Sequence, residues 1–448
     1  MTRLLKLDRE TWALAILFVA LWFVLFKPWV HGMDTVAYYS WLRSAVIDGD
    51  LQVRDEFEHY GYGNERGTSS TGYTYNEWAV GSAILWSPFF LIAHGISFLL
   101  GTLGVPVAMD GYGEIYIWAV SMGSALYAFA GLLMTGRLLH SLFNANVAFI
   151  ALVSAWLASS LVFYMYSHPL MSHANDMFVY ALFLTAWFYT RSKPTPIRYA
   201  LLGFVAGLCA LVHTQNAILV FFPFTEIVFS VLKDSRTQKT NLPIRQGFLQ
   251  MASFSAMWWI TFSPQMLVWH TVYGTFIQTN PYIYGSGSSF DFTQPQILKV
   301  LLSTDRGLFL WTPITILGVV GWISLFRRDS RLAVLLVSTF VLQLYLIASW
   351  SSWNGAAAFG QRFFTNQVPA FAFGLATLID WARSKVALRW IVGASILFIG
   401  WNGILMIRYV LEDVPRMGTM PLDQFILGQF TILPRQTGRV LQILFQRH

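Results

Sequence analysis

Eleven apolar runs recur along this sequence, and most are long enough to cross a lipid bilayer as a helix. A spanning helix needs about 20 mostly apolar residues because the hydrocarbon core is about 30 Å thick. Charged residues make up only 11% of the chain, whereas about 25% is typical of a soluble domain. The sequence therefore predicts an all-α integral membrane protein. The runs cover 12–30, 78–103, 113–135, 146–166, 176–190, 199–232, 247–269, 307–326, 332–349, 364–381 and 390–410.

The run 199–232 is too long for one crossing at about 1.5 Å per residue. Its middle holds the polar sequence His213-Thr214-Gln215-Asn216. We therefore expect two short helices that meet at these residues. With this division we expect about 11–13 transmembrane helices, all within a single polytopic membrane domain that covers residues 1–448.

Basic residues predict which loops face the cytoplasm, because Lys and Arg are enriched in cytoplasmic loops. The net charge is +7, and its carriers lie in short loops between apolar runs, which indicates membrane orientation rather than nucleic-acid binding. We place the N-terminus (Arg3, Lys6, Arg9) and the loops 233–246, 327–331 and 382–389 in the cytoplasm. The first outer loop, 31–77, the second large outer loop, 270–306, and the segment 350–362 then lie on the opposite face. A tail, 411–448, follows the last run.

This orientation puts the loop 31–77 outside and the loop 233–246 inside, so an odd number of crossings must separate them. The apolar runs between residues 78 and 232 give one crossing too many or too few. In one interpretation the run 78–103, with Gly81, Pro88 and Gly95, bends back without crossing. In the other, 199–232 is one long broken helix, and Arg191, Lys193 and Arg198 lie outside. The sequence leaves both open.

The first outer loop holds the most informative chemistry, with eight of the 22 acidic residues of the chain. Asp34 stands directly after the first run, and the segment Thr35–Ile47 has the pattern of an amphipathic helix. We expect Val36, Tyr39, Val46 and Ile47 to lie on the membrane, and Arg43, Ser44 and Asp48 to face water.

Asp34 has two interpretations. A carboxylate at this depth needs a partner or a task, and a single base suffices for inverting sugar transfer to a hydroxyl. Asp is also a favoured N-cap residue, so Asp34 could instead cap the helix Thr35–Ile47. The neighbouring Asp55 and Glu56 are candidates for binding an acceptor or a metal, or are a solvated acidic loop.

Three further polar clusters are expected on the same outer face. His168, His173 and Asp176 could coordinate a metal, but histidines five residues apart are not a strong metal spacing, which favours phosphate contact or structural hydrogen bonding. Arg306 could pair with a lipid phosphate or snorkel to the interface. Trp353 could stack on a sugar ring and Arg362 hold a phosphate, or both could belong to an interfacial aromatic belt. His213, inside an apolar run, is a functional candidate or a histidine satisfied by backbone carbonyls.

Taken together, these segments resemble the GT-C superfamily of polytopic glycosyltransferases, the group of the protein O-mannosyltransferases and aminoarabinose transferases. The resemblance covers most of the chain. It is carried by Asp34-Thr35-Val36-Ala37-Tyr38-Tyr39-Ser40-Trp41, the segment 76–90, Ser172-His173-Ala174, the segment 305–313, Trp353-Asn354-Gly355 and the segment 359–363.

The resemblance implies a GT-C type fold and an inverting transfer from a polyprenyl-phosphate-linked sugar, with Asp34 as the base. It implies a donor-phosphate site at Arg306, Arg362, His173 and His168. Binding of the acceptor or sugar is expected at Asp55, Glu56, Tyr38, Trp353 and His213. Metal dependence differs among members, so a divalent metal stays open.

The implied partners are the lipid-linked donor, membrane lipids and a glycolipid, polysaccharide or protein acceptor. The implied location is a bacterial inner membrane with the site facing outside. A multi-span transporter or flippase is the main rival, and it would place polar groups near the midplane. A scaffold without chemistry is a third interpretation.

Overall fold

The computed structural model describes residues 9–237, 242–278 and 289–445. These residues form helices, with only isolated β-bridges at Thr68–Thr74 and Phe290–Trp350, which confirms the all-α class. Arg3, Lys6, Lys239 and the centre of the loop 270–306 lie outside the described residues. The elements are α1 (Arg9–Leu25), α2 (Met33–Arg43), η1 (Ser44–Asp48), α3 (Arg54–His59), η2 (Gly63–Glu65), α4 (Gly81–Thr102), α5 (Glu114–His140), α6 (Ala145–Leu157), η3 (Phe163–Ser167), α7 (His173–Thr190), α8 (Pro196–Val212), η4 (Thr214–Val220), α9 (Phe221–Thr237), α10 (Leu242–Tyr273), α12 (Ile297–Leu302), α13 (Leu308–Trp311), α14 (Ile314–Arg328), α15 (Ser330–Ala348), η5 (Arg362–Gln367), α16 (Val368–Ala382), α17 (Leu388–Val410) and α18 (Leu422–Phe445).

Among the described residues, five helices are both long and apolar enough to cross a membrane. They are α4, α5, the continuous η4–α9 segment up to Leu232, α15 and α17. Two shorter helices, α6 and α8, are also apolar. Large apolar side chains such as Leu397, which is 75% exposed, remain on the surface of these helices. Since such surface is stable in lipid rather than in water, the chain is an integral membrane protein.

The contacts divide the chain into two compact units, which are described separately below. Unit 1 comprises residues 1–27, 128–167 and 290–448, and unit 2 comprises residues 28–127 and 168–289. The expectation of one polytopic domain stays a prediction.

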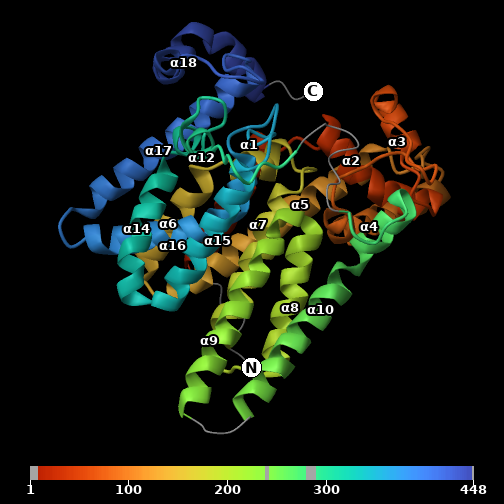
Figure 1. The fold of residues 1–448 in the computed structure, drawn as a ribbon. Helices are drawn as coiled ribbons and strands as arrows, with labels where there is room; N and C mark the ends of the chain where they lie inside the picture. Colours follow the sequence, from red (N-terminus) through yellow and green to blue (C-terminus); the bar gives the residue numbers. More distant parts are fainter. Residues whose placement is uncertain (1–8, 238–241, 279–288, 446–448) are drawn as a thin grey trace. The chain divides into compact units, whose positions relative to one another are not determined.

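In unit 2, the long run 199–232 is divided where its polar residues predict. Helix α8 ends at Val212, His213 adopts an extended conformation (φ −149°, ψ 114°), and η4 with α9 follows. Figure 1 shows α8, α9 and α10 side by side. A Cβ at Gly203 would lie 2.2 Å from the Phe254 carbonyl oxygen. The absence of a side chain at Gly203 therefore lets α8 and α10 pack backbone against backbone.

The basic residues after α7 lie on the side of unit 2 where α9 and α10 approach each other. Arg198 forms an ion pair with Glu226 of α9 at 2.9 Å, and the amide nitrogen of Gln250 in α10 donates to the Pro194 carbonyl at 2.7 Å. The helices α8 and α9 are therefore an antiparallel pair rather than one broken rod. The interpretation that placed Arg198 on the opposite side from the loop 233–246 is wrong.

The segments directly before and after α4 both contact the first outer loop. Before α4, the indole nitrogen of Trp41 donates to the Trp78 carbonyl at 2.9 Å. After α4, Nε of Arg43 donates to the Asp110 carbonyl at 2.8 Å. The chain thus returns to the loop 31–77 before α5 begins, which agrees with the interpretation that 78–103 bends back.

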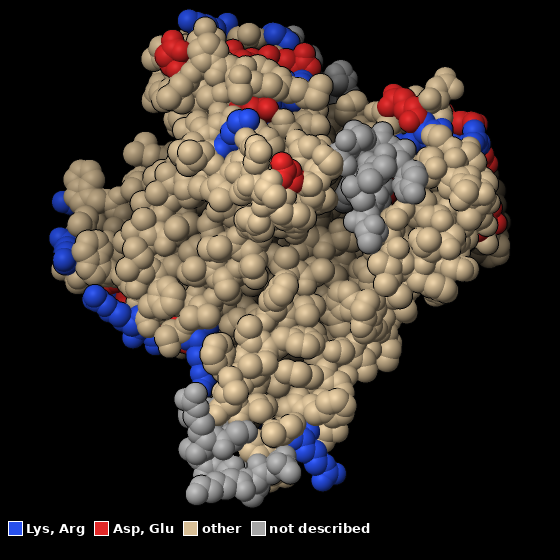
Figure 2. Space-filling view, viewed as in Figure 1, with Lys and Arg blue, Asp and Glu red and all other residues tan. Residues whose placement is uncertain are grey.

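In unit 1, the loops 327–331 and 382–389 meet at one end of the helices, as their shared orientation predicts. Asp380 forms ion pairs with Arg328 at 2.7 Å and with Arg383 at 2.9 Å. Figure 2 shows basic side chains gathered over the end of α14 and the turn between α16 and α17. Helix α15, 19 residues long, leads from this end to the opposite one.

The tail contains a helix, α18, that the apolar pattern did not indicate. Buried Arg408 of α17 holds it through an ion pair with Asp413 at 2.6 Å and a hydrogen bond to the Phe425 carbonyl at 2.5 Å. The helix is kinked at Gln436, two residues after Pro434, because proline cannot continue the hydrogen-bond ladder.

Candidate functional site

Asp34 occupies the first turn of α2 and is not the residue that caps it. The helix begins at Met33, Gly32 is the N-cap residue, and no side chain caps the helix. The Thr35 hydroxyl bonds to the carbonyls of His31 and Gly32 at 2.7 and 2.8 Å. The capping interpretation of Asp34 is therefore wrong. The Asp34 carboxylate is half-buried and lies at the positive end of the helix dipole.

A second carboxylate lies close to Asp34. Glu77 forms an ion pair with Arg66 at 2.7 Å, and both side chains are almost fully buried. Burial raises the pKa of Glu77, Arg66 lowers it, and the negative charge of Asp34 raises it further. In the sequence, Glu77 is one of the eight acids of the first outer loop and Arg66 is a basic residue among them. Their pairing across eleven positions has no spacing signal in the sequence.

Tyr38 connects the helix of Asp34 to the start of α7. Tyr38 follows Asp34 by four positions, so both lie on one face of α2. The Ser172 hydroxyl donates to the Tyr38 hydroxyl at 2.9 Å, inside the protein. Ser172 directly precedes His173, the first residue of α7. The first outer loop and the start of α7 are thus joined by a side-chain hydrogen bond within unit 2.

His173, Asp176 and His213 form a compact buried group. Their side chains offer three ligand atoms that all lie within 4.8 Å of one another, and residue exposures are 2%, 1% and 8%. The Asn216 amide donates to Asp176 Oδ1 at 2.5 Å and to the Cys209 carbonyl at 3.0 Å. These are residue types that can hold a metal.

The spacing of His168 and His173 did not identify this group, because its third member comes from the helix break at His213. His168 lies elsewhere, against the ring of Trp29 with a centroid separation of 5.3 Å. Trp29 also stacks on His31 at 4.8 Å.

Arg43 and Ser44 are buried, with exposures of 7% and 0%, so the expectation that they face water is wrong. Arg43 forms ion pairs with Asp48 at 2.5 Å and with Glu56 at 2.9 Å. A charged side chain enters a protein interior when it is paired and hydrogen-bonded. The helical period predicted a polar face, but the loop folds over that face and covers it.

Glu56 is fully buried beside Arg43, while its neighbour Asp55 is exposed. Burial raises the pKa of Glu56 to about 7, even though the hydrogen bond and charge of Arg43 lower it. Glu56 is therefore part of the interior of the first outer loop, and Asp55 is the acid of this pair that is exposed on its surface.

In unit 1, two predicted clusters meet at one end of the helices. The Asn354 amide donates to Asp305 at 2.8 Å, and Nε of Arg306 donates to the Ala358 carbonyl at 2.9 Å. Arg306 is 0% exposed. It also bonds to Asp305 and to the carbonyls of Pro415 and Arg416, so its donors hold three chain segments together.

Arg362 and Trp353 lie in the same part of unit 1. The Arg362 guanidinium lies 5.3 Å from the centre of the Phe363 ring, and Gln361 donates to the Trp353 carbonyl at 3.0 Å. The side chains of Arg362 and Trp353 are half-buried. Asp34 belongs to unit 2, so the expectation that Asp34, Arg306 and Arg362 converge stays a prediction.

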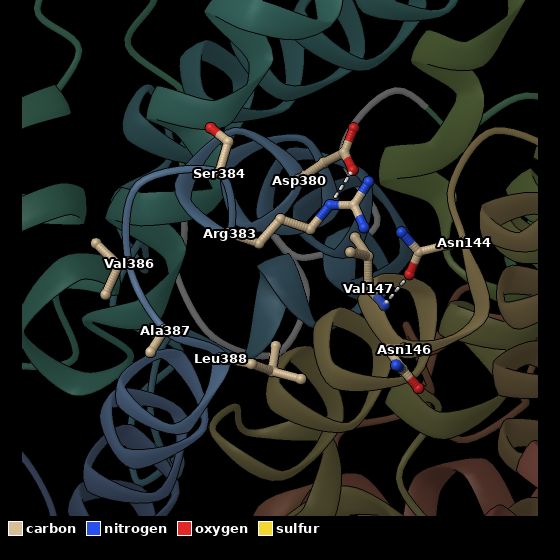
Figure 3. A pocket seen from close by; sticks show the side chains of 9 residues that line it. All are labelled: Asn144, Asn146, Val147, Asp380, Arg383, Ser384, Val386, Ala387 and Leu388. Carbon is tan, nitrogen blue, oxygen red and sulfur yellow. Dashed lines mark hydrogen bonds and ion pairs between the residues drawn. The ribbon is translucent and has the colours of Figure 1, made fainter.

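A cavity of about 440 Å³ lies in unit 1 but contains none of the predicted site residues. Figure 3 shows its lining, with Arg383 paired to Asp380, and Asn144 accepting from the Val147 amide. It lies at the end of α16 away from Arg362, so we do not assign the predicted chemistry to it. An apolar groove of about 250 Å³ lies between α6, α14, α16 and α17.

No protein-family model matches the chain, and no curated protein matches it. Among solved structures, the chain is similar to ArnT from Cupriavidus metallidurans in the apo state, with 12% identity, a TM-score of 0.49, and coverage of 96% of this chain and 76% of that one. It is also similar to the archaeal oligosaccharyltransferase AglB from Archaeoglobus fulgidus in complex with an inhibitory peptide and a dolichol-phosphate. That match has 12% identity, a TM-score of 0.40, and coverage of 98% of this chain and 55% of that one.

Proposed function

We propose that this protein is an inverting membrane glycosyltransferase of the GT-C kind. It would move a sugar from a polyprenyl-phosphate carrier to an acceptor hydroxyl at the non-cytoplasmic face. The observation that carries the proposal is the setting of Asp34. This carboxylate is half-buried in the first turn of α2, is not the cap of that helix, and lies close to the Arg66–Glu77 ion pair.

In this mechanism Asp34 removes the proton of the acceptor hydroxyl as its oxygen attacks the anomeric carbon. The bond from that carbon to the phosphate oxygen breaks, and the carrier leaves as polyprenyl phosphate. A phosphate is stable as an anion, so no acid has to protonate it, and one carboxylate base suffices. Attack from the face opposite the leaving group inverts the configuration.

Glu77 and Arg66 are positioning residues in this proposal. Their ion pair is buried, so it fixes the wall beside Asp34. His168 and Arg362 are proposed for the donor phosphate. We do not retain His173 for this role, because its side chain is buried in a group with Asp176 and His213. We do not retain Arg306 either, because its side chain is fully buried among protein acceptors.

The proposed outer site rests on the orientation that the basic residues predict, with the loops 233–246, 327–331 and 382–389 in the cytoplasm and the first outer loop on the opposite face. Among the described residues, α4, α5, the η4–α9 segment, α15 and α17 are long and apolar enough to cross a membrane, and α6 and α8 are shorter apolar helices. The expected 11–13 crossings are part of the proposal.

Nucleotide sugars stay in the cytoplasm, so an outer site has to receive its sugar on a lipid. The apolar groove between α6, α14, α16 and α17 is a candidate place for the lipid tail. We propose a bacterial inner membrane as the location and a glycolipid, polysaccharide or protein as the acceptor.

The test is sugar transfer by the purified protein in lipid nanodiscs, using polyprenyl-phosphate-linked sugars and candidate acceptors. Asp34→Asn should reduce turnover by at least about 100-fold, the usual contribution of a general base, while thermal unfolding stays unchanged. Glu58→Gln, an exposed acid of the same loop, is the matched control and should retain activity. Full transfer by Asp34→Asn would overturn the base assignment. If the protein is instead a scaffold without chemistry, the pathway should remain functional with the Asp34→Asn variant.

A further inference from the structure

We propose that His173, Asp176 and His213 bind a divalent transition-metal ion, with zinc the best match to these ligands. Two of the residues lie in the first turn of α7 and the third directly follows α8, all within unit 2, and they are at most 40 positions apart along the chain. The site does not depend on the proposed sugar transfer, because its test measures the metal itself.

The local fold brings the three ligands together. His173 and Asp176 are three positions apart in the first turn of α7, so they share one face of the helix. His213 follows the last residue of α8 and is extended, which turns its imidazole out of the helical path. The rings of His173 and His213 have centroids 5.9 Å apart.

The distances between the three ligand atoms would suit a metal ion after small side-chain movements. All three ligand atoms lie within 4.8 Å of one another. In a tetrahedral zinc site with bonds of about 2.0–2.1 Å, ligand atoms are roughly 3.3 Å apart. Rotations that move each terminal atom by about 1 Å would close this difference, and such movements lie within ordinary rotamer wells.

The surroundings orient the carboxylate as they do in metal sites. The Asn216 side chain donates to Asp176 Oδ1 at 2.5 Å and is itself fixed by the Cys209 carbonyl at 3.0 Å. Hydrogen-bond partners of this kind hold metal ligands in place and change affinity by about 10–100-fold when removed. A divalent ion here would also offset the cost of burying the Asp176 carboxylate, which is 1% exposed.

The group contains three ligands within the described part of the chain. Zinc sites with three protein ligands keep a position for water or another oxygen ligand. The main rival is a proton: a protonated histidine beside Asp176 would supply positive charge without any metal. The two models differ in metal content and in what zinc does to the stability of the protein.

The experiment uses the full-length protein in detergent, treated with a chelator and dialysed against Zn²⁺ or Co²⁺. We expect about one ion per chain, an absorption spectrum of tetrahedral Co²⁺, and a higher unfolding temperature with metal, because the ion binds only the folded state. His213→Ala should lose the spectrum. Asn216→Ala should weaken binding by about 10–100-fold. His94→Gln is the matched control, since His94 bonds to Tyr116 outside the group, and it should bind like wild type.

Three results would overturn the site: no stoichiometric metal in wild type, no effect of zinc on its unfolding temperature, or equal binding by wild type and His213→Ala. The last would identify an adventitious surface ion. If His213→Ala does not fold, Asn216→Ala decides, because it removes no ligand. Unchanged metal affinity in that variant would then reject the site.

Discussion

The hydroxyl groups of Tyr38 and Ser172 form a buried hydrogen bond of 2.9 Å between residues 134 positions apart. Tyr38 lies one turn after Asp34, and Ser172 directly precedes His173. The bond therefore links the proposed base to the proposed metal site. A displacement of α2 would therefore also shift the start of α7, and we expect a structural change at one site to alter the other.

The first prediction concerns this link. Tyr38→Phe leaves the Ser172 hydroxyl buried without that acceptor, which costs about 1–3 kcal/mol of unfolding free energy. Ser172→Ala removes the donor instead. We expect the double variant to be less destabilised than the sum of the two, with a coupling energy of about 1 kcal/mol. Thermal unfolding of all four proteins in detergent measures it. Additive effects would show that the bond does not contribute.

The second prediction concerns Glu56, whose pKa is raised by burial from 4.5 to about 7. The folded state then binds the proton more tightly than the unfolded state. The contribution of Glu56 to stability is complete below about pH 4.5 and is lost as the pH rises through about 7. The stability of wild type relative to Glu56→Gln should therefore fall across this interval, by on the order of 3 kcal/mol at most.

The comparison is made by thermal unfolding at a series of pH values, with Glu58→Gln as an exposed control. The difference between wild type and Glu58→Gln should stay flat. If the relative stability of wild type rises with pH instead, the ion pair with Arg43 outweighs the cost of burying the Glu56 carboxylate.

The helix break at His213 was predictable from sequence because four polar residues in a long apolar run cannot all stay unpartnered in lipid. The position of Asp34 at the start of a helix was also predictable, since the first apolar run ends just before it and an amphipathic pattern follows. In both cases one local feature determines the outcome.

The environments of Arg43 and Arg306 were not predictable, because they depend on distant segments. Arg43 is buried by a loop that returns with Asp110, and Arg306 by carbonyls from Ala358 and Pro415. A helical period shows which face is polar, but it does not show whether another segment covers that face. Hence the sequence suggested Arg306 as a phosphate ligand, whereas in the structure its guanidinium donates to backbone carbonyls inside the protein.

The third prediction concerns α4, whose composition suits a crossing while its contacts bring the chain back. In a Cys209→Ser background, we expect Ala108→Cys and Glu58→Cys to react with an impermeant maleimide in intact cells. Both positions are exposed. Lys193→Cys, also exposed, should react only after permeabilisation. Reaction of Ala108→Cys only after permeabilisation would mean that α4 crosses the membrane.

The last prediction concerns the packing of α8 on α10. A Cβ at Gly207 would lie 2.8 Å from the Trp258 carbonyl oxygen, and backbone cannot yield as a flexible side chain can. Gly207→Leu should therefore lower the unfolding free energy by more than the ~1–3 kcal/mol typical of overpacking. Gly95→Leu in α4, where an added Cβ meets nothing within 4 Å, is the matched control and should be neutral or stabilising, because a helix gains when glycine is replaced. Since α8 carries His213 at its end, we also expect Gly207→Leu to weaken Co²⁺ binding while Gly95→Leu leaves it unchanged. Equal unfolding temperatures for the two variants would show that the close approach of α8 and α10 is not a feature of the protein in its membrane.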